Sequence, residues 1–192
     1  MNKCLRVYKV LHSTEALGFG RRFVIWTQGC MQNCPNCIAP DSHDINGGKS
    51  VNIDDLYEMI LSKKGIDGLT ITGGEPFLQC SVLVDLIKKL KEQRSELTYI
   101  LYTGYKFDDL NVQKEALNLI NMLDLLIDGN YNYSLDYNIP LIGSVNQQVY
   151  ILTENGEKLA KYMQEQTSRN IEIFFDYSEV PFVVGIPPRG NY

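Results

Sequence analysis

Apolar residues gather in short runs along this chain, separated by segments in which apolar positions recur every three or four residues. Short apolar runs bounded by turn residues predict buried β-strands. We expect six such strands and an extra strand near residues 5–10. The six runs are 22–27, 68–72, 98–102, 123–127, 148–152 and 171–175.

The segments between these runs carry helix signals. Asn52 can cap a helix that begins at Ile53, because its side-chain oxygen can accept a bond from a free first-turn amide. Apolar positions in 83–90 and 116–123 follow helical spacing, and a further helix is expected over 155–166. Strands alternating with helices predict parallel βαβ units, whose functional loops lie at the carboxyl ends of the strands.

Polar or glycine-rich clusters follow four of the predicted strands. Since the carboxyl ends of parallel strands share one edge of a sheet, we expect these clusters to converge on one face of the molecule. The clusters are Gln28-Gly29-Cys30, Thr72-Gly73-Gly74-Glu75-Pro76, Tyr102-Thr103-Gly104-Tyr105 and Asp128-Gly129.

Three cysteines, Cys30, Cys34 and Cys37, lie within eight residues directly after the first predicted strand. Each iron of a four-iron cluster takes a terminal ligand, normally a Cys thiolate, so three thiols leave one iron open to a small molecule. Zinc is an alternative, because His43 could complete a Cys3His set, although structural zinc sites normally use paired Cys units. A chance group of structural thiols is the third possibility. The sequence favours the iron–sulfur site.

The Gly73-Gly74-Glu75-Pro76 segment is the second candidate for chemistry. Glycines after a strand expose backbone amides and carbonyls, and Pro76 fixes a turn or the start of a helix. A pair of glycines is by itself typical of an ordinary turn, and Glu75 could either cap the next helix or accept a bond from a ligand. Its place one strand after the cysteines favours a role in binding.

Composition narrows the class of protein. The chain has 192 residues, 44% of them apolar, and a formal net charge of -5, which fits one globular domain. It lacks the basic cluster that nucleic acid requires. No apolar stretch approaches the ~18 residues that span a membrane, and the N-terminus lacks a signal core, so we expect a cytoplasmic protein without membrane association. Cys4 and Cys80 are expected to be bystander thiols.

The spacing Cys-x3-Cys-x2-Cys after one strand, with Gly-Gly-Glu-Pro after the next, resembles the radical S-adenosylmethionine (SAM) superfamily. Residues 18–30 resemble the opening segment of the glycyl-radical-enzyme activases. Residues 124–129 and 141–148 resemble the activating component of anaerobic ribonucleotide reductase. These matches run from about residue 18 to residue 151, and the remaining C-terminal residues carry much less signal.

The resemblance implies a fold as well as a family. We expect an α/β domain built as a partial (β/α)6-type barrel, with a mainly parallel open sheet and helices outside. A full eight-fold barrel typically needs about 250 residues, more than this chain has. We expect a single domain over 1–192, with a core at about 18–152 and a family-variable segment over 153–192.

The resemblance also implies cofactors. A [4Fe-4S] cluster held by Cys30, Cys34 and Cys37 would bind SAM at its open iron and cleave it reductively to methionine and a 5′-deoxyadenosyl radical. The residues implied to contact SAM are Asn36, Gly73, Gly74, Glu75, Thr103 and Asp128.

Individual roles follow from the resemblance. Glu75 and the backbone before it would lie near the SAM amino group, and Asp128 could pair with the SAM ammonium. Asn36 stands where many members carry an aromatic residue beside the adenine.

In activases the radical takes a hydrogen atom from a glycine Cα of a large partner enzyme. The resemblance therefore implies a glycyl radical enzyme, such as anaerobic ribonucleotide reductase, as the partner, and a reductant such as flavodoxin or ferredoxin. Two alternatives stay open here. One is a radical SAM enzyme that modifies a small molecule or peptide, and the other is a non-catalytic zinc or electron-transfer module.

Overall fold

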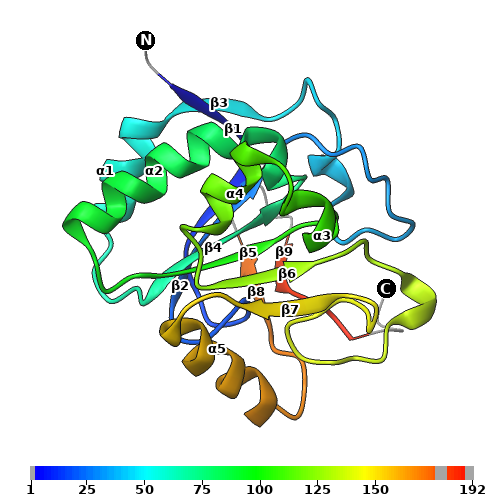
Figure 1. The fold of residues 1–192 in the computed structure, drawn as a ribbon. Coiled ribbons are helices and arrows are strands. Elements are labelled where there is room, and N and C mark those ends of the chain that lie inside the picture. The colour runs from blue at the N-terminus through cyan, green and yellow to red at the C-terminus, as the bar shows by residue number, and fades with distance from the viewer. Residues whose placement is uncertain (1–2, 176–180, 189–192) are drawn as a thin grey trace.

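The computed structural model describes residues 3–175 and 181–188. Within them, seven strands form one sheet in the order β3-β1-β2-β4-β5-β6-β7, and two more strands form a separate hairpin (Figure 1). The strands of the sheet are β1 (Cys4–Thr14), β2 (Arg22–Thr27), β3 (Lys49–Asn52), β4 (Gly68–Gly73), β5 (Thr98–Tyr102), β6 (Leu125–Asp128) and β7 (Gln148–Ile151). The strands of the hairpin are β8 (Ile171–Phe175) and β9 (Pro181–Gly185).

Helices connect many of these strands. The predicted cap of the helix that begins at Ile53 is confirmed, because the Asn52 side chain accepts a bond from the Asp54 amide at 2.9 Å. The predicted helices over 83–90, 116–123 and 155–166 are present with somewhat different bounds. No helix in the described residues is long and apolar enough to cross a membrane. The helices are α1 (Ile53–Leu61), α2 (Cys80–Gln93), α3 (Phe107–Leu110), α4 (Lys114–Ile120) and α5 (Glu154–Glu165), with 3-10 turns at Pro40–Ser42, Pro76–Gln79 and Tyr133–Leu135.

The centre of the sheet is parallel, as expected. β2 pairs in parallel with β4, β4 with β5, and β5 with β6. These strands are covered on both faces, which is why they read as continuous apolar runs. Phe23 and Ile25 of β2 pack with α1, α2 and α4, whereas Val24 and Trp26 pack on the opposite face of the sheet. The helices α1, α2 and α4 lie together on one side of the sheet in Figure 1.

The expected mainly parallel open sheet is present, but two of the six predicted strands do not pair in parallel within it. β7 runs antiparallel to β6, and β8 leaves the sheet to pair with β9. A parallel return needs a crossover, normally a helix, but residues 129–147 hold only a 3-10 turn between β6 and β7. β8 alternates exposed and half-buried residues rather than being buried throughout, so it was a poor candidate for the interior of a sheet.

The last part of the chain covers the face of the sheet opposite α1, α2 and α4, which corrects the expectation that all helices lie outside. Leu159 and Ala160 of α5 pack on Leu125 and Ile127 of β6. The hairpin packs beside them, with Val184 of β9 in one apolar cluster with Val24 and Trp26 of β2. α5 and the hairpin therefore lie over the face of the sheet that an open barrel with all its helices outside would leave uncovered.

Candidate functional site

The loops after β2 and β4 begin side by side and are joined through their backbones. Thr27 and Gly73 are register partners at the ends of the two strands. The Gly74 amide donates to the Thr27 carbonyl at 2.8 Å, and the Glu75 amide donates to the Gly29 carbonyl at 2.7 Å. The convergence predicted from strand order is therefore present, because backbone bonds hold the glycine-rich loop against the start of the cysteine loop.

Only glycine fits the two positions where these loops touch. Gly73 has a φ of +99°, and a Cβ there would lie 2.6 Å from the Cα of Trp26. A Cβ on Gly74 would lie 2.4 Å from the carbonyl oxygen of Gly29. Side chains cannot be accommodated at such separations from backbone, so this glycine pair permits a close approach and is more than a generic turn.

The cysteine loop is shaped by its polar residues. The Cys30 amide donates to the His43 carbonyl at 3.0 Å, and the buried Gln28 side chain donates to the carbonyls of Asp41 and Asp44. These contacts hold residues 41–44 beside the end of β2. Asn33 and Asn36, each one residue before a cysteine, adopt left-handed backbone with φ of 47° and 57°. Asn tolerates that conformation better than most residues, which gives Asn36 a backbone role.

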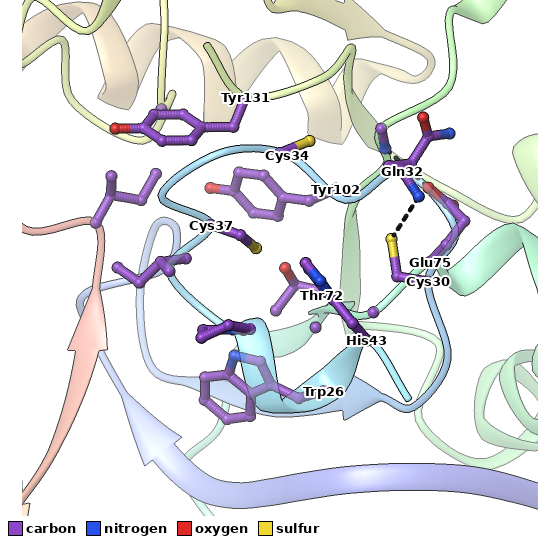
Figure 2. Close-up of a pocket in the computed structure, with 18 of the residues that line it drawn as sticks. Trp26, Cys30, Gln32, Cys34, Cys37, His43, Thr72, Glu75, Tyr102 and Tyr131 are labelled. Atoms are coloured by element: carbon purple, nitrogen blue, oxygen red, sulfur yellow. Dashed lines mark hydrogen bonds between the residues drawn. The ribbon is translucent and has the colours of Figure 1, made fainter. Parts of the chain in front are cut away.

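All three thiols line one cavity of about 350 Å³ (Figure 2). Cys30, Cys34 and Cys37 are half-buried and free of disulfides. Burial raises the pKa of the Cys30 and Cys37 thiols, so metal binding, which requires thiolates, would release protons. The Cys30 sulfur accepts a bond from the Gln32 amide at 3.4 Å.

The arrangement fits a cluster. Within residues 3–175 and 181–188, no three His, Cys, Asp or Glu side chains lie close enough to share a single metal ion. A four-iron cluster does not require this, because each thiolate binds a different iron. Three thiols spaced around one cavity match such a ligand set. His43 lines the same cavity, but it is its backbone carbonyl that accepts the bond from the Cys30 amide of the cysteine loop.

Glu75 joins the cavity to the loop after β5. Its side chain is 1% exposed, and its carboxylate accepts bonds from the Phe77 amide at 3.0 Å, the Thr103 hydroxyl at 2.8 Å and the Gly104 amide at 2.9 Å. Burial raises the pKa of Glu75 to about 7. The bond to Phe77 caps the turn Pro76–Gln79, so the capping role is present. Glu75 also lines the cavity, so contact with a ligand stays a prediction.

Of the remaining residues predicted to contact SAM, all but one line the cavity, and that one holds neighbouring segments together. Asn36 and Thr103 line the cavity, together with both glycines of the Gly73–Gly74 pair. Asp128 does not appear among its lining residues. The Asp128 carboxylate is fully buried and accepts bonds from the Phe107 amide at 2.8 Å and the Gln148 amide at 3.2 Å. It fastens the loop after β5 to β7.

Several lining residues were not among those predicted to contact SAM. The only tryptophan, Trp26, lines the cavity with Tyr102 and Tyr131 (Figure 2). Gln147 lines it as well. Gln147 accepts a bond from the Gly143 amide at 2.7 Å and donates to the Gly129 carbonyl at 2.7 Å, which pins the loop between β6 and β7. A further set comes from the C-terminal segment: Phe182, Val183, Gly185, Ile186 and Pro187. No motif marks that segment in the sequence.

Comparison with known proteins decides the family. Residues 16–150 match the model of a 4Fe-4S single cluster domain. The chain is 30% identical over 141 residues to the anaerobic ribonucleoside-triphosphate reductase-activating protein of Enterobacteria phage T4, covering 71% of this chain and 88% of that protein. This chain belongs to the radical SAM family. It is accordingly an enzyme whose cofactors are a [4Fe-4S] cluster and SAM. These cofactors rule out the alternative of a non-catalytic zinc module.

Two further proteins are similar to this chain. The chain is 31% identical over 149 residues to the pyruvate formate-lyase-activating enzyme of Staphylococcus aureus (strain USA300), covering 72% of this chain. It spans 59% of the length of that enzyme. Among solved structures, QueE from Escherichia coli overlaps 53% of each chain with a TM-score of 0.43 at 16% identity.

Proposed function

We propose that this radical SAM protein generates a glycyl radical on a large partner enzyme of the anaerobic ribonucleotide reductase type. In this proposal Cys30, Cys34 and Cys37 hold the cluster, and SAM occupies the cavity that they line. The observation that carries the proposal is the pair of backbone bonds, at 2.8 and 2.7 Å, by which the Gly74 and Glu75 amides fix the glycine-rich loop to the cysteine loop.

When bound, the cluster and SAM together supply the electron and the radical for hydrogen abstraction. The protein's own part is to position them and exclude other reactions. The glycine pair brings backbone close to the cysteine loop without a side chain between. Glu75 provides a carboxylate at the cavity whose position is fixed by Thr103 and Gly104, and an amino group of SAM would offer it a cationic or donating partner.

The partner assignment is supported by the two activating proteins that match the chain, which act on a ribonucleotide reductase and on pyruvate formate-lyase by their names. We propose a cytoplasmic setting, a low-potential reductant such as flavodoxin or ferredoxin, and a single domain over 1–192 with a core at about 18–152 and a variable segment over 153–192.

The decisive experiment is anaerobic reconstitution with iron and sulfide, followed by reduction with dithionite in the presence of SAM and a candidate ribonucleotide reductase. We expect 5′-deoxyadenosine as a product and a glycyl doublet in the electron paramagnetic resonance spectrum. A reductase whose radical glycine is changed to alanine is the control and should give no doublet. Production of 5′-deoxyadenosine without a doublet on any glycyl radical enzyme would redirect the proposal to a small-molecule or peptide substrate. Absence of both would refute it.

A further inference from the structure

The hairpin β8–β9 lies outside the segment that matches the family, yet it forms part of the cavity. The family match ends at residue 150, and the hairpin strands pair only with each other among the described strands. Nevertheless Phe182, Ile186 and Pro187 line the same cavity as the thiols. In Figure 2, β9 runs along one side of the cavity, and Cys30 and Glu75 lie on the other.

Aromatic packing holds the hairpin against the sheet. The Phe182 and Trp26 rings meet edge to face, with centroids 5.5 Å apart, and the Lys9 ammonium lies 3.5 Å from the Phe182 ring centroid. Val184, two residues after Phe182 in β9, is buried in the same apolar cluster as Leu17 and Trp26. These contacts place the Phe182 ring at the cavity from a segment more than 150 residues away from β2 in the sequence.

Arg169 fixes the segment that follows the hairpin. Its guanidinium is almost fully buried and pairs with the buried Asp136 carboxylate at 2.7 Å. It also donates to the carbonyls of Pro187 at 2.9 Å, Ile142 at 2.7 Å and Gly143 at 2.9 Å. One side chain thus ties the end of β9 to the loop between β6 and β7, and both segments contribute to the cavity wall.

The two sides of the cavity differ in polarity. The polar wall consists of Cys30, Gly73, Gly74, Glu75 and Thr103, and the apolar wall of Leu17, Trp26, Phe182, Ile186 and Pro187. A charged amino-acid group could not be satisfied against the apolar wall, whereas a flat, weakly polar ring system could be buried there. The volume of about 350 Å³ is near the lower limit of the ~300–1,000 Å³ of pockets that enclose one ligand of drug size.

Taking the proposed function as given, we infer that Phe182 is a binding and specificity-determining residue for SAM. The methionine half of SAM faces the polar wall, and the nucleoside half lies against the apolar wall that the hairpin completes. Phe182 supplies a ring to that wall.

The test is equilibrium dialysis of SAM against anaerobically reconstituted protein, without reductant. Phe182→Ala should weaken binding roughly tenfold, an effect typical of a lost aromatic–base contact, and Phe182→Tyr should restore it. Phe175→Ala is the matched control, because Phe175 belongs to the same hairpin but is 77% exposed and does not line the cavity. It should bind SAM as the wild type does. Iron content should be unchanged in all three variants.

A direct readout covers the case in which Phe182→Ala fails to fold. Irradiation of the wild-type protein with an azidoadenosine analogue of SAM should label the segment 181–188. Label confined to the cysteine loop, or unchanged SAM affinity in Phe182→Ala, would overturn the inference. If the wild type binds SAM and gives the glycyl doublet in either case, the proposed function stands and only this inference fails. If the wild type binds no SAM, both the proposed function and this inference fail.

Discussion

The polar and apolar walls of the cavity are built in opposite ways. The polar wall joins loops that follow three neighbouring strands, β2, β4 and β5, and backbone hydrogen bonds and glycines fix the contact between the first two. The apolar wall is assembled from β2 and the C-terminal hairpin through side-chain packing and one buried arginine. Backbone contacts depend on a few obligatory residues and leave a motif, whereas packing tolerates many residue types and leaves none. The comparison teaches that motifs identify the chemistry of a site and not its full outline.

The largest effect should come from the proposed cluster ligands, which adjoin the polar wall. Cys34→Ala removes one of three proposed cluster ligands and should reduce SAM cleavage to background, measured as 5′-deoxyadenosine under dithionite. Cys4→Ala is the matched control, because Cys4 is exposed and stands apart from the cavity. Turnover retained in Cys34→Ala would show that the ligand assignment is wrong.

Among the residues that hold the apolar wall in place, Arg169 should contribute most to the free energy of unfolding. Arg169→Ala leaves the Asp136 carboxylate buried without its ion-pair partner, and breaking a buried pair costs about 3–5 kcal/mol. Urea denaturation measures the change in the free energy of unfolding. Arg21→Ala breaks an exposed pair with Glu15 and should cost no more than about 1 kcal/mol. Equal losses in the two variants would contradict the anchoring role of Arg169.

A glycine substitution tests how closely the two loops approach. Gly73→Ala combines a positive φ with a contact of 2.6 Å to backbone, and should destabilise the protein by about 3 kcal/mol. Gly65→Ala is the control, because Gly65 also has a positive φ, +76°, but the nearest atom to its Cβ lies 3.9 Å away. It should cost only about 1 kcal/mol in the free energy of unfolding. The two costs would be equal if no close approach existed.

The smallest effect is a pH dependence from Glu75. Its pKa is raised from 4.5 to about 7 in the folded protein, so the folded state favours the protonated carboxyl. The stabilisation is complete below pH 4.5 and is lost as the pH rises through about 7, by up to about 3 kcal/mol. Urea denaturation of ligand-free wild type and Glu75→Gln between about pH 5 and pH 8 measures it. The stability difference between them should change with pH in that direction; a constant difference would contradict the burial effect.

The sequence predicted the central strands because each is a continuous apolar run. It could not predict that β7 turns back antiparallel, since a run of apolar residues marks a strand but not its direction. The sequence of β8 reads as an apolar run, yet Ile171, Ile173 and Phe175 are exposed. Its partner β9 was not predicted, because pairing of two short strands depends on the surface that receives them. Asp128 was predicted to face SAM from its position at the end of a strand, but local amides take its carboxylate.

By itself the sequence predicted the cofactors of this protein, a [4Fe-4S] cluster and SAM, and it proposed Cys30, Cys34 and Cys37 as the cluster ligands and a glycine-rich loop one strand later as a part of the site. Neighbouring ligands and obligatory glycines must be encoded locally, so they can be read locally. Only the tertiary structure decided that the C-terminal hairpin forms the second wall of the cavity, and that Arg169 anchors it. Those contacts join residues far apart in the chain, and they arise from the burial of apolar surface, which is not directional and leaves no fixed spacing.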